Sequence, residues 1–217
     1  AYEEALRTCG LEVKVLEADS SFPDSCFVED AALCTPACAI VTNPGAPSRN
    51  AEKRLMEPVL RDYYEQVESI ISPGTLDAGD VMMVGDHYYI GISERTNREG
   101  ADQLIRILDQ YGMTGSIIPL HTMLHLKSGV SYLENNNLLV TGEFVDHPAL
   151  AGFEHLVVES EESYAANSLW VNSTVLVPAG FPKTLELIKQ AGYETRVLDV
   201  SEFRKLDGGL SCLSLRF

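Results

Sequence analysis

Short apolar runs separated by polar turns recur along the chain and predict β-hairpins. The first pair is 31–34 with 39–41, and the later pairs are 81–84 with 87–91, 130–133 with 138–141, and 169–171 with 174–177. Two short apolar runs around a polar turn are typical of antiparallel strands joined by a tight connection. The hydrophobic pattern therefore predicts four hairpins.

Amphipathic segments fill several of the gaps between the hairpins. Residues 50–71, 98–112 and 182–192 place apolar side chains at helical spacing. Pro58 predicts an irregular start to the first of these helices, whereas Pro182 and Gly192 suit the first turn and the C-cap of the last. A further helix is expected at 1–9, and short strands are expected at 10–16, 195–198 and 210–217.

Hairpins, helices and short strands repeat as a strand–strand–helix–strand unit. The units open near positions 30, 80, 128, 167 and 212, at a period of roughly 40–50 residues. Such units bury their faces by stacking or by closing into a ring, and in a ring the unit openings meet near the axis. The last unit holds one strand only, so we expect that an N-terminal strand is missing from this chain.

Composition narrows the class of protein. The 217 residues carry a net charge of −16, which argues against nucleic acid and anionic membranes as partners and is compatible with a small cationic substrate. No basic-plus-apolar leader opens the chain, and no apolar run is long enough to span a bilayer. The odd number of cysteines, five, indicates free thiols in a reducing, cytoplasmic compartment. One catalytic domain over 1–217 is the simplest arrangement.

Three far-separated residues supply the parts of an activated nucleophile. Cys212 follows Gly208-Gly209, His125 opens the third unit, and Asp77 opens the second. A base can generate thiolate, and an acid can orient that base. A lone trio of this kind is more often structural, but all three stand at unit openings that a ring would bring together. They are therefore our candidate catalytic residues.

Acidic and basic side chains stand at neighbouring positions of the units. Asp24, Glu29 and Asp30 lie in one short segment between apolar residues, which is typical of carboxylates that line a cleft. Arg49 and Arg95 each follow the second strand of a unit, and arginine binds carboxylates through two parallel hydrogen bonds. The acidic segment fits the small cationic substrate that the net charge allows, and the two arginines could bind a carboxylate.

Together these motifs resemble the dimethylarginine dimethylaminohydrolase family of guanidino-group-modifying enzymes. The resemblance rests on six segments, in order and at matching spacing: 24–30, 46–49, 76–80, 95–97, 124–128 and 206–212. It implies a five-bladed α/β propeller of ββαβ units. It also implies hydrolysis of Nω,Nω-dimethyl-L-arginine, or the monomethyl form, to citrulline and a methylamine, without a cofactor or metal.

The resemblance also implies a role for each candidate residue. Cys212 is the expected nucleophile, His125 the proton donor and Asp77 its acidic partner. The expected binding residues are Glu29 and Asp30 for the guanidinium, Asp24 and the Leu206 carbonyl for the α-ammonium, and Arg49 and Arg95 for the α-carboxylate. Family members also carry an N-terminal strand and a mobile loop whose leucine covers the substrate. We expect both to be missing from residues 1–217.

Other readings of the same residues stay open. Arginine deimination or amidino transfer would use the same fold and mechanism, and room for methyl groups beside the guanidinium would decide between them. A non-catalytic amino-acid-binding protein of this fold is a second class, and a homodimer is compatible with either. A cysteine protease fits poorly, because clustered carboxylates do not help an uncharged amide.

Overall fold

The computed structural model describes residues 1–217 and shows an α/β protein. Its internal contacts define two compact units. The first, the 18–126 unit, comprises Ala18–Leu126 together with the C-terminal segment Cys212–Phe217. The second, the 127–211 unit, comprises Ala1–Glu17 and Lys127–Ser211. Each unit contains two of the four sheets.

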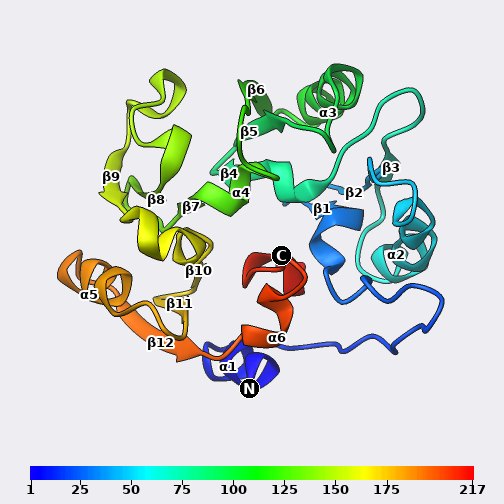
Figure 1. Ribbon diagram of the computed structural model, residues 1–217. Helices are drawn as coiled ribbons and strands as arrows, with labels where there is room; N and C mark the ends of the chain where they lie inside the picture. The colour runs from blue at the N-terminus through cyan, green and yellow to red at the C-terminus, as the bar shows by residue number, and fades with distance from the viewer. The chain divides into compact units, whose positions relative to one another are not determined.

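One strand order recurs in all four sheets (Figure 1). Two strands form an antiparallel hairpin, and a third strand pairs in parallel with the second. Parallel strands run in the same direction, so the chain must return from the end of one strand to the start of the next. A two-residue turn is too short for this, and a crossover connection is needed. Helices supply that crossover in three of the sheets, and a stretch with two short 3₁₀ turns supplies it in the sheet β7–β9. The four predicted hairpins and the strand–strand–helix–strand repeat are thereby confirmed in outline.

The 18–126 unit contains the sheets β1–β3 and β4–β6 with one long helix for each. Its regular elements are η1 (Val28–Ala31), β1 (Ala32–Cys34), β2 (Ala39–Val41), η2 (Asn50–Glu52), α2 (Lys53–Arg61), β3 (Val67–Ser69), η3 (Ala78–Asp80), β4 (Val81–Val84), β5 (His87–Ile92), α3 (Arg98–Gln110) and β6 (Thr114–Pro119).

The 127–211 unit contains the sheets β7–β9 and β10–β12. Its regular elements are α1 (Tyr2–Thr8), β7 (Val130–Tyr132), β8 (Asn137–Val140), η4 (Gly142–Phe144), η5 (Pro148–Leu150), β9 (Glu154–Val157), η6 (Ser160–Ala166), β10 (Leu169–Val171), β11 (Thr174–Pro178), α5 (Pro182–Gln190), β12 (Glu194–Leu198) and α6 (Ser201–Arg204). The chain passes between the units at three points, and the short elements α4 (Leu126–Gly129) and η7 (Ser211–Leu213) span the second and third of them.

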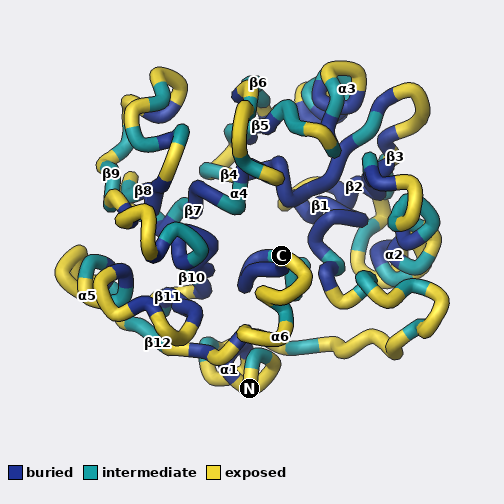
Figure 2. Tube along the Cα trace, viewed as in Figure 1, coloured by how far each residue is buried: buried dark blue, intermediate teal, exposed yellow.

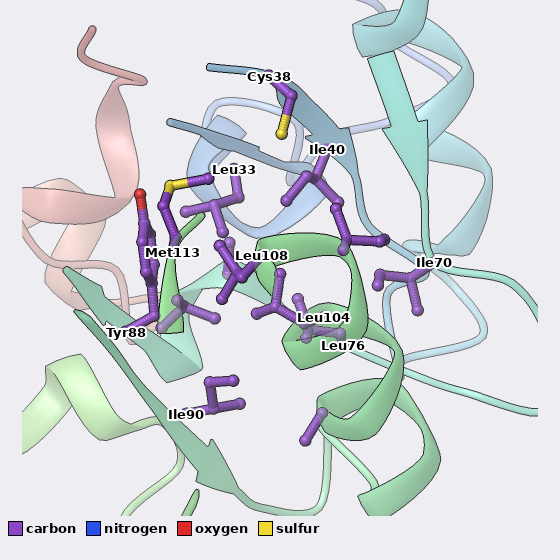
Figure 3. Packing of buried hydrophobic residues seen from close by; sticks show 14 residues of the cluster. Leu33, Cys38, Ile40, Ile70, Leu76, Tyr88, Ile90, Leu104, Leu108 and Met113 are labelled. Carbon is purple, nitrogen blue, oxygen red and sulfur yellow. The ribbon is translucent and has the colours of Figure 1, made fainter. Parts of the chain in front are cut away.

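The largest apolar cluster of the 18–126 unit lies between α3 and the strands of both its sheets (Figure 3). Leu104 and Leu108 of α3 meet Ile40 of β2 and Ile90 of β5 there, all with no exposed surface. Strands β1 and β2 are buried along their whole length, as the dark blue segments of Figure 2 show. This rigid base carries the loops at the start of β1 and β4, which hold the candidate site.

Three predicted elements differ from the structure. The helix expected over 50–71 begins with a 3₁₀ turn, as Pro58 suggested, but ends at Arg61, and 67–69 form strand β3. Residues 10–16 contain no strand. Residues 210–217 contain only η7 and pair with none of the four sheets, and without a pairing partner an extended segment forms no strand. No helix has both the length and the hydrophobicity that crossing a membrane requires.

Candidate active site

The centre of the candidate site is an ion pair between Asp77 and His125. His125 Nε2 lies 3.3 Å from Asp77 Oδ2, and both side chains are largely buried. Asp77 precedes η3 at the entrance to β4, and His125 directly precedes α4. Because Nε2 is directed at the carboxylate, Nδ1 is the ring nitrogen left for chemistry with another group.

Two hydrogen bonds hold Asp77 in place, one to its carboxylate and one from its backbone N–H. Its second oxygen, Oδ1, accepts the Gly45 N–H at 2.8 Å, and its own N–H donates to Thr96 Oγ1 at 3.1 Å. A buried carboxylate needs such donors, because an ionised oxygen without a partner is costly away from water. The Asp77 side chain therefore has a fixed position against which the imidazole is oriented.

The electrostatic surroundings of His125 favour its charged form. Burial disfavours its charged form, but the hydrogen bond with Asp77 and the negative charges of Asp30, Asp80 and Asp77 outweigh burial and raise its pKa to about 9. The imidazole is accordingly protonated at neutral pH. A protonated imidazole can donate a proton to a leaving group.

Asp30 is the third member of this cluster. One ligand atom from each of Asp30, Asp77 and His125 lies within 4.8 Å of the others. Gly79 makes this approach feasible: its N–H donates to Asp30 Oδ1 at 3.3 Å, and a Cβ at this position would come within 2.8 Å of Asp30 Oδ1 and 3.0 Å of His125 Nδ1. The absence of a side chain at residue 79 thus allows the acid and the imidazole to meet.

The same three side chains are of the types that ligate divalent metals. Two features disfavour a metal here. Nε2 of His125 is already paired with Asp77, and its raised pKa means that a metal must displace a tightly held proton. Two buried carboxylates beside a protonated imidazole suit an organic cation with N–H donors better.

Arg49 lies against the acidic side of the cluster. Its guanidinium pairs with Asp30 and, at 2.7 Å, with Glu52, and it donates to the carbonyl oxygens of Asp24 and Phe27. Burial disfavours the guanidinium charge, but the hydrogen bonds and charges of Glu52 and Asp30 raise its pKa further. Arg49 therefore braces the loop that carries Asp24 and Asp30.

Glu29 and Arg95 occupy neighbouring parts of the same unit. Glu29 is 3% exposed and pairs with Arg216 of the C-terminal segment at 3.3 Å. The backbone of Arg95 packs on Gly45 so closely that a Cβ on residue 45 would lie 2.2 Å from the Arg95 carbonyl oxygen. Gly45 thus links Arg95 to Asp77, whose carboxylate it also binds.

Cys212 belongs to the same unit as the Asp77–His125 pair. It is half-buried in η7, and the residues that follow it are anchored on the first sheet: Leu215 packs against the cluster formed by β1, β2 and α2, and Arg216 pairs with Glu29. Leu206 belongs to the other unit and is 60% exposed. The structure thus brings Asp30, Asp77 and His125 into one cluster, and Arg49 forms an ion pair with Asp30.

Sequence reasoning missed the residues that hold the cluster together. Gly45, Gly79 and Thr96 contact the acids through backbone or hydroxyl groups, and a glycine or threonine at a turn carries little information by itself. The one available signal is their place beside candidate residues, since Gly79 lies between Asp77 and Asp80 and Thr96 follows Arg95.

Solved structures define the class of the fold. The N-terminal domain of ArgZ, an arginine dihydrolase from the ornithine–ammonia cycle in cyanobacteria, matches 99% of this chain with 82% of its own length, at a TM-score of 0.90 and 18% identity. A mutant of dimethylarginine dimethylaminohydrolase (DDAH) from Pseudomonas aeruginosa, complexed with citrulline, matches all of this chain and 85% of its own, at a TM-score of 0.98 and 52% identity. The chain has the α/β fold of arginine-modifying, pentein-type proteins.

Sequence comparison identifies the family within this class. The family model for N,N dimethylarginine dimethylhydrolase, eukaryotic, matches residues 1–176. The P. aeruginosa DDAH is 53% identical over 218 residues, covering 100% of this chain and 86% of its own, and that of Streptomyces coelicolor is 38% identical over 100% and 83%. The chain belongs to the dimethylarginine dimethylaminohydrolase family.

Proposed function

We propose that the chain hydrolyses Nω,Nω-dimethyl-L-arginine, and the Nω-monomethyl form, to L-citrulline and dimethylamine or methylamine. The observation that carries this proposal is the buried Asp77–His125 pair beside Asp30, in a chain 53% identical to the P. aeruginosa DDAH. The class of substrate follows from the charges, because buried carboxylates bind a flat cation with N–H donors on its edges.

Resonance makes the guanidinium carbon a poor electrophile, so its orientation matters. We expect Asp30 and Glu29 to bind the N–H edges of the substrate guanidinium and to present its central carbon to Cys212. Arg49 pairs with both Asp30 and Glu52. When Asp30 binds the substrate, Glu52 therefore remains as the counter-charge of Arg49. Asp24 and the Leu206 carbonyl are the proposed contacts of the α-ammonium, and Arg49 and Arg95 those of the α-carboxylate.

The proposed reaction has two steps. The Cys212 thiolate attacks the guanidinium carbon, a C–S bond forms, and the C–N bond to dimethylamine breaks as His125 protonates the departing nitrogen. His125, now neutral, takes a proton from water, whose oxygen attacks the thiouronium carbon. The C–S bond then breaks as the new hydroxyl gives its proton to solvent and becomes the citrulline carbonyl; the thiolate returns, and citrulline leaves. Asp77 holds the imidazole in place through both steps.

The proposal also includes the wider architecture. We propose that the recurring sheets are blades of a five-bladed α/β propeller and that residues 1–217 form one catalytic domain. The repeated order of two antiparallel strands and one parallel strand supports this arrangement. The five free cysteines are compatible with a cytoplasmic location.

A citrulline assay on three substrates tests the function. We expect citrulline from dimethylarginine and from monomethylarginine, and little from arginine; citrulline from arginine alone would instead establish a deiminase. Cys212→Ser should abolish turnover and leave substrate binding, measured by calorimetry, within about threefold, because the hydroxyl is a far weaker nucleophile at neutral pH. The matched control is Cys9→Ser in the other unit, which should keep full activity. Turnover by Cys212→Ser would refute the assigned nucleophile.

A further inference from the structure

Asp80 is a fully buried carboxylate that the reaction described above does not use. It has no exposed surface and lies at the end of η3, where it precedes β4. Its oxygens accept three hydrogen bonds: from Ser93 Oγ at 2.6 Å, from Thr96 Oγ1 at 2.7 Å and from the Leu126 backbone N–H at 2.9 Å. Burying a carboxylate costs free energy, so a buried carboxylate that is held by three hydrogen-bond donors needs an explanation.

One branch of these contacts leads to His125. The Leu126 N–H, which binds Asp80 Oδ1, belongs to the peptide bond that joins His125 to Leu126. Gly91 of β5 leaves room for this approach, because a Cβ there would lie 3.1 Å from the same oxygen and 3.2 Å from Leu126 Cβ. Asp80 thus fixes the backbone from which the imidazole projects.

The other branch leads to Asp77. Thr96 donates its hydroxyl hydrogen to Asp80 Oδ2, which leaves its oxygen lone pairs for the Asp77 N–H at 3.1 Å. The carboxylate therefore sets the direction of the Thr96 hydroxyl, and the hydroxyl in turn holds the backbone of Asp77. Ser93 supports the same turn, since its Oγ accepts the N–H groups of Arg95 and Thr96.

We infer that Asp80 is a positioning residue for the proposed hydrolysis, because one carboxylate holds both members of the Asp77–His125 pair, His125 through the Leu126 amide and Asp77 through Thr96. The inference rests on the proposed function of that pair. Asp80 touches neither the imidazole ring nor the Asp77 carboxylate in any of these contacts. It acts through the two segments that carry them.

The charge of Asp80 adds a second effect. Three acids from two segments surround the imidazole: Asp30 of η1, Asp77 before η3 and Asp80 at its end, and each helps to raise the pKa of His125. Burial raises the pKa of Asp80 itself, while the charge of His125 and the three hydrogen-bond donors oppose that rise. Removal of the negative charge at residue 80 must lower the pKa of His125.

Asp80→Asn tests the inference with the shape of the side chain retained. We expect kcat for dimethylarginine to fall by about 10- to 100-fold with KM within about twofold, the pattern of lost alignment rather than lost binding. The alkaline limb of kcat against pH should move to lower pH, because His125 loses its proton more easily. An NMR titration of His125, assigned by comparison with His125→Gln, should show the same lowered pKa in the free protein.

The control for Asp80→Asn is Asp86→Asn, an exposed carboxylate in the turn between β4 and β5. It should leave kcat, the alkaline limb and the His125 titration unchanged. If Asp80→Asn folds and also leaves all three unchanged, Asp80 is only a structural residue and the inference is wrong, whatever the loss in melting temperature. Absence of citrulline from the wild type would refute the proposed function instead, and the NMR titration would still report on Asp80.

Thr96 provides a second test if Asp80→Asn does not fold. Thr96→Val removes the hydroxyl that joins Asp80 to Asp77 and keeps the shape, so kcat should fall by about tenfold or more. Thr96→Ser retains the hydroxyl and should keep kcat within about threefold of the wild type. Equal activities of the valine and serine variants would overturn the inference.

Discussion

The lack of a side chain at Gly79 determines how closely Asp30 and His125 can approach each other. The Gly79 N–H binds Asp30, and a Cβ at this position would lie only 3.0 Å from His125 Nδ1. The φ angle of Gly79 is not positive, so the requirement is one of space and not of backbone conformation. At the scale of single residues, the cluster thus depends on steric fit at Gly79 as well as on the charges of Asp30 and Asp77.

Gly79→Ala should therefore lower activity. The added methyl group forces apart Asp30 and His125, and we expect kcat to fall by about tenfold or more with a loss of about 1–3 kcal/mol in the free energy of unfolding. Urea titrations and citrulline assays give both quantities. Gly152→Ala is the matched control, because a Cβ at residue 152 meets no heavy atom within 4 Å. If both variants retain wild-type kcat, the close approach of Asp30 and His125 is not required.

At the scale of elements, the start of α3 connects the core to the site. The Asn97 side chain caps the helix by accepting the Gly100 N–H at 2.8 Å, and the same oxygen accepts the Thr75 N–H at 2.9 Å. Its amide group donates to the Pro73 carbonyl oxygen at 2.8 Å. One side chain thus ties α3 to the segment that leads to Asp77, and Arg95 and Thr96 directly precede it.

Asn97→Ala should destabilise the protein by about 1–2 kcal/mol, since a helix cap and the tie to residues 73–75 are lost together. Chemical denaturation measures this loss. Asn97→Asp keeps the oxygen acceptor and lacks only the donor to Pro73, so its loss should be clearly smaller. Equal stabilities of Asn97→Ala and the wild type would show that the packing of Leu104 and Leu108 alone holds α3 in place.

At the scale of the whole molecule, the chain is not divided into consecutive halves. Residues 212–217 join the unit that contains Asp77 and His125, although more than eighty residues of the other unit intervene. Leu215 packs against the first sheet, Arg216 pairs with Glu29, and the Phe217 ring lies 5.2 Å from that of Tyr63 and 5.3 Å from that of Tyr64. These contacts fix the segment that begins with Cys212.

Leu215→Ala should loosen this segment and lower kcat by about tenfold, because the half-buried side chain anchors the segment that carries Cys212, the proposed nucleophile. The effect on stability should be smaller, since Leu215 is only partly buried. Citrulline assays at saturating dimethylarginine, with circular dichroism as a check on folding, measure the effect. Leu16→Ala, at a 39% exposed position of the other unit, is the matched control and should leave kcat unchanged. A Leu215→Ala variant with wild-type kcat would contradict the proposed anchoring.

Local pattern was sufficient for much of the fold. The hairpins β1–β2 and β4–β5 and the helices α3 and α5 follow from apolar spacing, turn residues and caps close in sequence. The third strands were harder: β12 was expected at 195–198, but β3, β6 and β9 were not predicted, because local sequence does not show that a segment pairs with a strand beyond a crossover connection. The strand expected at 210–217 was wrong for the same reason, since pairing depends on a neighbour that local sequence does not reveal.

The amino-acid sequence by itself determined which residues could take part in chemistry, because a thiol, an imidazole and carboxylates are chemical identities that no fold changes. Motif order and spacing also indicated the family to which the chain belongs. Only the tertiary structure decided which groups meet: Asp30 with His125 across Gly79, Arg49 with Asp30 and Glu52, and Asp80 with both segments of the Asp77–His125 pair. Such contacts depend on distances of a few ångströms between residues far apart in the chain, and packing alone sets those distances.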